Sequence, residues 1–341
     1  MDYGSIFLPI RKHLVSVEKE LKNQIPTGVP LSKEILKHLL LRPGKRLRPS
    51  IVLLSALSVN NRINKNIIFA SAAVELLHNA SIIHDDIVDE AKLRRGVKSA
   101  NKIWGDHATV LAGDYLLAKS LFLINKSKNP AVMSSVTAAA SELANGQILD
   151  IMLSKREIPF NEKIYFKMIN LKTASLISSS SEIGAMLSGA NRSTVNSMRK
   201  YGVSLGISYQ LIDDVLDFIG DSKNMGKKAM SDIKEGKVSL PMLICLKNLK
   251  KSESNKPKNI LINKNFNRSN LSFLYNLVLD SEAIEETIRI ANNYSLKAVS
   301  SLKNLKDSKF KEALINLARV NSSRMYWRWK RKIGKKNLKK R

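Results

Sequence analysis

Two clusters of aspartates in this sequence have the same spacing. The pattern Asp-Asp-x-x-Asp covers residues 85–89 and again residues 213–217, and each cluster follows an apolar stretch. Residues four positions apart lie on one face of a helix, so the outer carboxylates of each cluster come together. Because close carboxylates repel each other unless a cation neutralises them, the spacing predicts magnesium bound with water and phosphate. The residues concerned are Asp85, Asp86, Asp89, Asp213, Asp214 and Asp217.

Basic residues flank both clusters. Arg94 and Arg95 follow the first cluster directly, and a guanidinium group matches the geometry of phosphate oxygens. Taken singly, these cations are ordinary surface charge, and one acidic cluster alone is an ordinary solvated face. Two matched clusters with cations beside them favour a site for two diphosphates. The other basic residues are Lys45, Arg46, Arg48, Lys172, Lys227 and Lys237, and the hydroxyl of Thr173 stands beside Lys172.

Helices must position these groups, because apolar residues recur with helical periodicity along the chain. Only 15 glycines and 9 prolines interrupt the 341 residues, and no stretch shows strand–helix alternation. We expect an all-α fold, a single large helical bundle over residues 1–323 with a basic tail over 324–341. The polar, lysine-rich residues 250–269 are expected to form a surface excursion. Predicted helices cover 4–24, part of 27–41, 50–59, 66–90, 105–124, 130–153, 161–189, 193–219, 239–249, 270–278, 281–303 and 307–325.

Composition limits the choice of partner and compartment. The 57 basic and 29 acidic residues give a net charge of +28, which suits nucleic acid, anionic lipid or phosphorylated small molecules, or is plain solvated surface. Cys245 is the one cysteine, so no disulfide forms within the chain, as in a reducing compartment. The N-terminal residues lack the apolar region of a signal peptide, and no apolar run approaches the ~18 residues of a membrane span. These features indicate a cytoplasmic protein.

Ordered motifs identify a family. The segments G-K-R-L-R-P, E-L-L-H-N-A-S-I-I-H-D-D-I-V-D, L-R-R-G, G-D-Y-L-L-A, K-T-A, Y-Q-L-I-D-D-V-L-D and E-G-K-V-S-L-P follow one another along the chain. In this order they resemble the trans-type isoprenyl diphosphate synthases, or polyprenyl synthetases, over about residues 30–245 and more loosely to about 320. One departure is Pro43, where the family usually has a glycine. It affects the expected shape of that loop but not its charges.

The resemblance implies an isoprenoid-synthase bundle around a central apolar cavity. It also implies a reaction that joins isopentenyl diphosphate to an allylic diphosphate with about three Mg²⁺ ions per active site. Asp85, Asp89 and Asp213 would hold the metal, and the other three aspartates would support them. Isopentenyl diphosphate would be bound by Lys45, Arg48, His78 and Arg95. The allylic diphosphate would be bound by Arg94, Lys172, Thr173, Gln210, Lys227 and Lys237.

Some of these residues have plainer interpretations. A lone helical histidine such as His78 is often structural, although its place seven residues before Asp85 favours a phosphate contact. Trp104 and the pair Tyr165–Phe166 are interpreted as packing residues.

Product length should depend on the side chains just before Asp85. One helical turn rises about 5.4 Å, close to the length of an isoprene unit. Short-chain members of the family block the tunnel there with an aromatic side chain, whereas this chain has Ala80 and Ser81, with Leu77 on the next turn. We therefore expect a long-chain product of the octaprenyl or decaprenyl type, used for a quinone side chain. Closure of the tunnel by another helix, for example at Met152 or Met168, is the alternative.

The family also implies a homodimer, and the tail suggests a further contact. Residues 324–341 carry ten Lys or Arg with Tyr326, Trp327 and Trp329 among them. This composition suits peripheral contact with the inner face of a membrane, and a solvated tail is the equal alternative. Nucleic acid is not an expected partner. The alternative functions are a shorter-chain geranylgeranyl or farnesyl diphosphate synthase, a non-catalytic regulatory subunit of a heteromeric synthase, and a terpene cyclase.

Overall fold

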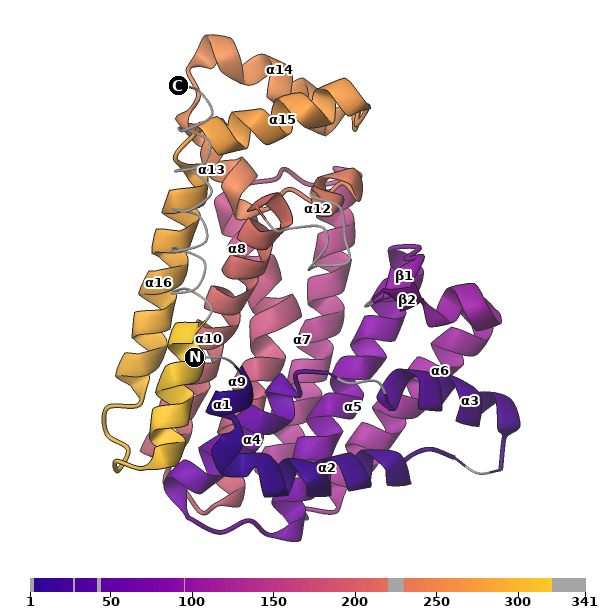
Figure 1. Ribbon diagram of the computed structural model, residues 1–341, viewed down its shortest axis with the longest axis vertical. Coiled ribbons are helices and arrows are strands. Elements are labelled where there is room, and N and C mark those ends of the chain that lie inside the picture. The colour runs from indigo at the N-terminus through magenta and orange to yellow at the C-terminus, as the bar shows by residue number, and fades with distance from the viewer. Residues whose placement is uncertain (1–2, 27, 42–43, 95, 220–229, 321–341) are drawn as a thin grey trace. The chain divides into compact units, whose positions relative to one another are not determined.

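The fold is all-α, as the sequence predicts. The structure is a computed structural model, and it describes residues 3–26, 28–41, 44–94, 96–219 and 230–320. Within these ranges the only strands are β1 (Leu93–Arg94) and β2 (Val97–Lys98), which pair antiparallel in a short hairpin; helices form nearly everything else (Figure 1).

The contacts within the chain divide it into two compact units, and each is described by itself. The first unit comprises the described residues of Met1–Ala144, Ala174–Val203 and Ala298–Leu317. The second comprises those of Asn145–Thr173, Ser204–Lys297 and Ala318–Arg341. Among the described residues, α7 (Pro130–Lys155), α10 (Arg192–Ile219), α16 (Ala283–Ser301) and the helical segment 309–320 contribute residues to both units.

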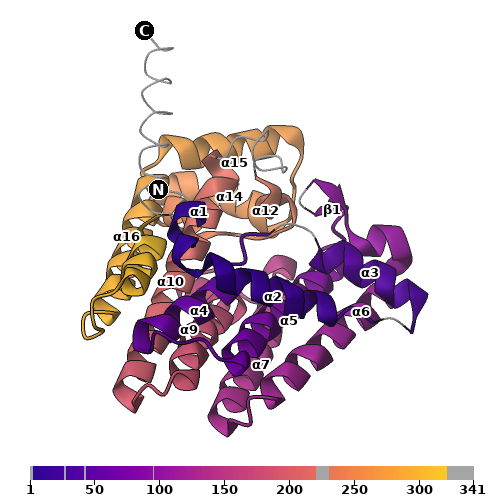
Figure 2. The same cartoon turned by 60° about the horizontal axis from the view of Figure 1, so that its bottom comes forward.

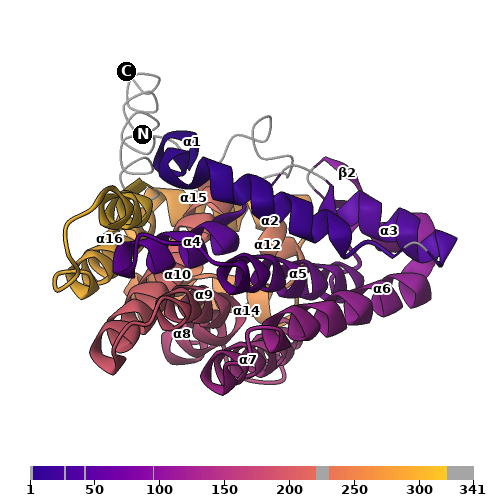
Figure 3. The ribbon, with the colours of Figure 1, turned by 90° about the horizontal axis from the view of Figure 1, so that it is seen from below.

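Helix α5 (Lys65–Val88) is the core of the first unit, and it packs against α2, α4, α6 and α9 (Figures 2 and 3). Its residues 69–77 are buried on every side, as expected for a helix that neighbours surround. Gly184 lets α9 approach α4 closely, because an added Cβ would lie 2.4 Å from the carbonyl oxygen of Val52. The other elements of this unit are α1 (Tyr3–Ile6), the 3₁₀ turn η1 (Leu8–Ile10), α2 (Arg11–Asn23), α3 (Pro30–Leu40), α4 (Leu47–Val59), α6 (Ala100–Asn125) and α9 (Ser175–Leu187).

The second unit contains a π-helical turn that the sequence did not predict. The expected continuous helix over 161–189 is divided into α8 (Glu162–Ile169), the π-helical turn η2 (Asn170–Ala174) and α9. Gly146 of α7 packs against this turn, because an added Cβ would lie 2.5 Å from the backbone nitrogen of Lys172. Single π-turns inside helices occur often at functional sites. The remaining elements of this unit are α12 (Ser231–Lys234), α13 (Leu240–Asn248), α14 (Lys251–Ile262) and α15 (Arg268–Asp280).

Most residues of the expected surface excursion over 250–269 are exposed, but the sequence did not predict that a large part of it forms helix α14. Its buried face consists of Ser254, Pro257, Ile260 and Leu261, and this face packs into the second unit beside α13. Glu253 also accepts a hydrogen bond at 3.4 Å from the backbone of Lys250 at the helix start. The lysines and asparagines between the buried positions hide the helical periodicity in the sequence.

Two helices among the described residues, α5 and α6, have the length and mean hydropathy of a membrane span. The expectation that no segment approaches a span is therefore too strict. The structure buries 67% of the most apolar window of α5 and 39% of that of α6. Because the core helix of a compact unit has the same length and composition, these two properties alone do not make either helix a span.

Candidate functional site

The first aspartate cluster lies at the C-terminal end of α5. Asp86 is buried, and its carboxylate forms an ion pair at 3.5 Å with Arg94 of the β1–β2 hairpin. The side chain of Asn101 donates to the backbone carbonyl of Asp86 at 3.2 Å. Asp85 and Asp89 are only half-buried, so the outer pair of carboxylates reaches solvent. The structure thus brings Arg94 to the cluster, whereas Arg95 lies outside the described residues.

Arg46 fixes the segment that carries Lys45 and Arg48. Its guanidinium bonds Glu18 of α2 at 2.5 Å, Glu75 of α5 at 2.9 Å and the carbonyl oxygen of Leu40 at 2.9 Å. The guanidinium of Arg46 is therefore already paired with carboxylates of the protein and is not placed to bind a phosphate.

The other predicted basic residues of this unit differ in exposure. Lys45 is exposed, and its ammonium lies 4.8 Å from the ring centroid of Tyr3. Arg48 and His78 are half-buried. These three are the described members of the predicted isopentenyl diphosphate site, and all belong to the first unit.

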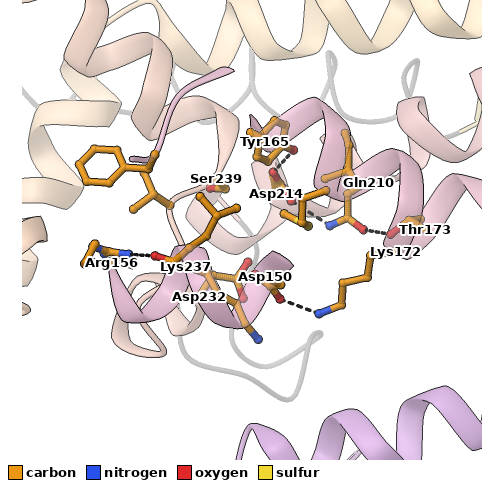
Figure 4. Close-up of a pocket in the computed structure, with 15 residues that line it drawn as sticks. Asp150, Arg156, Tyr165, Lys172, Thr173, Gln210, Asp214, Asp232, Lys237 and Ser239 are labelled. Atoms are coloured by element: carbon orange, nitrogen blue, oxygen red, sulfur yellow. Dashed lines mark hydrogen bonds and ion pairs between the residues drawn. The ribbon is translucent and has the colours of Figure 1, made fainter. Parts of the chain in front are cut away.

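A pocket of about 160 Å³ lies within the second unit (Figure 4). Aspartates and cations share its wall, as a site for a metal-bound anion requires. Five residues predicted from the sequence line it: Lys172, Thr173, Gln210, Asp214 and Lys237. Lys227, predicted with them, lies outside the described residues.

A chain of hydrogen bonds fixes the polar wall of this pocket. Thr173 donates to the Gln210 amide oxygen at 2.8 Å, and the Gln210 amide donates to Asp214 Oδ1 at 2.9 Å. The hydroxyl of Tyr165 donates a short hydrogen bond to Asp214 Oδ2. Burial raises the pKa of Asp214 to about 6, and burial with the nearby charge of Asp214 raises the pKa of Tyr165 well above its ordinary value. Tyr165 is therefore more than the packing residue that the sequence predicted, because its hydroxyl also fixes Asp214.

The three aspartates of the second cluster have three different environments. Asp213 is exposed, while Asp214 accepts the two donors just described. Asp217 is buried and accepts bonds from the backbone and hydroxyl of Ser231 at 3.1 and 2.8 Å and from the backbone of Asp232 at 3.4 Å. Asp217 thus holds the start of α12, and Asp213 presents the most accessible carboxylate of the cluster.

Lys172 is held from two sides. Its ammonium forms an ion pair at 2.6 Å with Asp150 of α7, and its backbone lies against Gly146. Asp150 was missed by sequence reasoning because it stands alone, without a second carboxylate at helical spacing. Asp232 and Arg156 also line the pocket and were missed. In the sequence, Gly146, four positions before Asp150, was the local signal that another segment, here the backbone of Lys172, packs closely against α7.

The donor set suits a hard divalent cation. The accessible carboxylates at the outer positions of the two clusters offer oxygen ligands, which magnesium prefers. Among the described residues, no group of three or more His, Cys, Asp or Glu side chains encloses an ion without help. In the first unit Asp85 and Asp89, and in the second unit Asp213, therefore offer carboxylates of the kind that suits a hydrated ion, which completes its coordination with water and phosphate.

The predicted chain-length residues lie on α5. Leu77 and Ala80 are buried, and Ser81 is half-buried with its hydroxyl donating to the backbone carbonyl of His78 at 2.9 Å. Met168, the proposed alternative closure, lines the pocket of the second unit, whereas Met152 is half-buried outside the pocket lining.

Comparison with known proteins assigns the chain to a family. The polyprenyl synthetase family model matches residues 29–278. Component 2 of heptaprenyl diphosphate synthase from Bacillus subtilis is 33% identical over 310 residues, covering 91% of this chain and 87% of the relative. Geranylgeranyl diphosphate synthase from Saccharolobus solfataricus is 32% identical over 297 residues, covering 85% and 89%.

A solved structure gives the same result. A polyprenyl synthase from Caulobacter crescentus, crystallised with calcium and isoprenyl diphosphate, superposes with a TM-score of 0.89 at 29% identity. The superposition covers 94% of this chain and 98% of the Caulobacter chain. Sequence and fold agree over nearly the whole length, so the chain belongs to the polyprenyl synthetase family and is a trans-prenyltransferase.

Proposed function

We propose that this enzyme is a magnesium-dependent synthase that extends an allylic diphosphate with isopentenyl diphosphate to a long-chain all-trans polyprenyl diphosphate. The observation that carries the product length is the absence of an aromatic side chain on α5 between residues 70 and 88. Ala80 and Ser81, one turn before Asp85, are both small. Each helical turn of about 5.4 Å accommodates about one isoprene unit, so these positions leave the tunnel open for several units, and we propose a product of about seven to ten.

The cations of the pocket bind the allylic diphosphate in this proposal. Lys172, held by Asp150, and Lys237 contact its oxygens together with Thr173 and Gln210, while Arg94 acts beside the first cluster. Lys45, Arg48, His78, Arg95 and Lys227 complete the two diphosphate sites. Asp85, Asp89 and Asp213 would hold magnesium, which would supply Lewis-acid stabilisation of the leaving diphosphate. Asp86, Asp214 and Asp217 support these ligands.

The chemistry needs no protein nucleophile. The allylic C–O bond breaks, and the double bond of isopentenyl diphosphate forms the new C–C bond to the allylic carbon. A proton then leaves the extended chain for the released diphosphate. The basic side chains stabilise the departing charge, and the apolar wall of α5 excludes water from the carbocation. Holding the two substrates aligned accounts for much of the rate.

Product sizing tests the proposal. The enzyme is incubated with labelled isopentenyl diphosphate, farnesyl diphosphate and magnesium, and the products are separated by chain length. We expect long-chain products from the wild type, and about farnesyl length from Ala80→Tyr supplied with a shorter primer, since the ring fills about one helical turn of the tunnel. Ser81→Ala is the matched control, because it keeps a small side chain and should leave the length unchanged.

The outcomes separate the alternatives. No elongation by the wild type would overturn the synthase proposal, and products of geranylgeranyl length would favour the shorter-chain alternative. An unchanged product from Ala80→Tyr would show that α5 does not set chain length and would favour closure by another helix.

We also propose that the enzyme is a cytoplasmic homodimer with peripheral membrane contact. Its product would supply the side chain of a quinone. Both aspartate clusters are intact, which favours a catalytic subunit over a regulatory one. The name of the Bacillus relative, a synthase component, keeps a heteromeric assembly as the alternative. Light scattering of the purified chain, with its activity measured in the same fraction, distinguishes an active homodimer from a component that needs a partner.

A further inference from the structure

Arg156 ends helix α7 in a conformation that arginine rarely adopts. Its φ is +66°, in the left-handed region that favours glycine. The backbone N–H of Arg156 donates to Leu153 at 3.2 Å, and that of Glu157 donates to Met152 at 3.0 Å. This pair of bonds is the Schellman motif, whose left-handed position is usually glycine. The left-handed backbone would favour glycine at this position, so the reason for an arginine is sought in the contacts of its side chain.

The guanidinium of Arg156 joins three stretches of the second unit. Nη1 donates at 2.7 Å to the carbonyl oxygen of Leu153, at the end of its own helix, and at 2.7 Å to that of Gly236. Nε donates at 3.0 Å to the carbonyl oxygen of Leu261, at the end of α14. The guanidinium also lies 5.3 Å from the ring centroid of Phe160. Among the described residues, the acceptors of these bonds are backbone carbonyl oxygens, so the contacts define a position without pairing the guanidinium with a carboxylate.

Gly236 is itself the left-handed residue of a second Schellman motif. Its φ is +84°, its N–H donates to Ile233 at 2.9 Å, and the N–H of Lys237 donates to Asp232 at 2.8 Å. An added Cβ at Gly236 would lie 2.9 Å from the carbonyl oxygen of Ser154. The turn that ends α12 therefore rests directly on the end of α7, and Arg156 bonds the two.

The residue after Gly236 is Lys237, which lines the pocket with Lys172 and Asp214 (Figure 4). Its ammonium lies 2.9 Å from Glu235, on the same turn, and its side chain is largely buried. The position of this cation therefore depends on where the turn lies. We propose that Arg156 is a positioning residue that sets the place of Lys237 and thereby the affinity of the pocket for the allylic diphosphate.

The inference rests on the proposed function, because it takes Lys237 as a ligand of that diphosphate. The inference applies to Lys237 and not to Lys172. Lys172 is fixed by Asp150 and Gly146, and it has no bond to Arg156 among the contacts described. Loss of Arg156 should therefore weaken one of the two cationic contacts and leave the other. The isopentenyl diphosphate residues of the first unit should be unaffected.

A double-mutant cycle tests it. Arg156→Gly suits the left-handed backbone and removes the guanidinium, so we expect KM for farnesyl diphosphate to rise about tenfold, with KM for isopentenyl diphosphate within about twofold. Lys237→Ala should raise the farnesyl KM at least as much. The double variant should be no worse than Lys237→Ala alone, because Arg156 acts only through that lysine. Calorimetric binding of farnesyl diphosphate with magnesium, without isopentenyl diphosphate, should show the same order of affinities.

The possible results have distinct meanings. Multiplied effects in the double variant, or equal increases in both KM values, would overturn the inference and indicate a merely structural role. A raised farnesyl KM in Lys237→Ala with none in Arg156→Gly would overturn the inference while leaving the proposed function intact. No effect of Lys237→Ala would overturn the inference and remove Lys237 from the proposed allylic diphosphate site. Arg156→Lys keeps the charge but reaches fewer carbonyl oxygens, so it should give an intermediate KM for farnesyl diphosphate. This variant replaces Arg156→Gly in the test if the glycine variant does not fold.

Discussion

At the scale of single residues, Asp214 is fixed within the protein on both of its oxygens. Tyr165 and Gln210 donate to opposite oxygens of the carboxylate, which leaves the exposed Asp213 as the accessible member of the pair. Both donors stabilise the ionised form, yet burial outweighs them and the pKa of Asp214 rises to about 6. The ordinary value near 3.8 applies to the unfolded chain.

This shift predicts how the stability of the metal-free enzyme depends on pH. Because the folded pKa lies above the unfolded one, the folded state binds the proton more tightly, and its advantage is complete below about pH 4. The advantage is lost as pH rises to about 6, by up to about 3 kcal/mol. Urea unfolding at several pH values should show this decline in the wild type and a smaller one in Asp214→Asn. Equal declines in both proteins would contradict the assignment.

Arg46 supports a second prediction at this scale. It pairs with the buried Glu75 and with Glu18, so replacing it leaves a buried carboxylate without its cation. Arg46→Met should reduce the free energy of unfolding by about 3–5 kcal/mol, and Glu75→Gln in the same chain should restore part of it. Chemical denaturation of the two variants measures this difference. No recovery in the double variant would show that the carboxylate of Glu75 is not the source of the loss.

Sequence reasoning reached these residues unequally. The aspartates were found because their motif recurs at helical spacing, and Lys172 because it stands in K-T-A, one of the segments that resemble the family. The structure brings Lys172, Thr173, Gln210, Asp214 and Lys237 to one pocket. Tyr165, Asp150 and Arg156 were missed as site residues because each acts through a partner far away in the sequence. Asp214, Lys172 and Gly236 become their neighbours only after folding.

At the scale of elements, the π-helical turn η2 shows where local patterns stop being informative. The apolar spacing over 161–189 is continuous, so it predicts one helix, but the close approach of α7 at Gly146 coincides with the extra residue of the turn. The same limit applies to α14, whose buried face is diluted by lysines. Most other helices agree with the periodicity, because a single apolar face buried against α5 or α13 is enough to define them.

Gly146→Ala tests the role of this close contact. An added Cβ would lie 2.5 Å from the nitrogen and 2.7 Å from the Cα of Lys172, so the turn must move. We expect a loss of about 1–3 kcal/mol in stability and a higher KM for the allylic diphosphate. Gly28→Ala is the matched control, since nothing lies within 4 Å of its added Cβ, and it should be near neutral in thermal unfolding. Equal behaviour of the two variants would contradict the packing argument.

At the scale of the whole molecule, charge is the property that neither unit's fold explains. The net charge is +28, and the two diphosphate sites use only a small part of it. Within the described residues, Arg11, Lys12, Lys19 and Lys22 are exposed on α2, with Val15 between them 66% exposed. The basic tail 324–341, which lies outside the described residues, adds ten more cations beside three aromatic side chains. The long polyprenyl product that we propose would be insoluble in water, so a surface that contacts anionic lipid would place the enzyme near the membrane in which such a product is used.

Vesicle binding distinguishes this role from ordinary solvated charge. Removing residues 324–341 should abolish most sedimentation with vesicles rich in anionic lipid, while the wild type binds them and ignores neutral phosphatidylcholine. Binding by the wild type should fall as salt rises, because the attraction is screened over about 10 Å at 0.1 M. Elongation activity should persist in the truncated enzyme, since the family match ends at residue 278. Charge reversal of Lys12 and Lys19 in the full chain tests α2 independently of the tail. Loss of vesicle binding in this variant but not in the truncated enzyme would assign the membrane contact to α2. Unchanged binding after both changes would refute membrane contact through either surface and leave the charge as solvated surface.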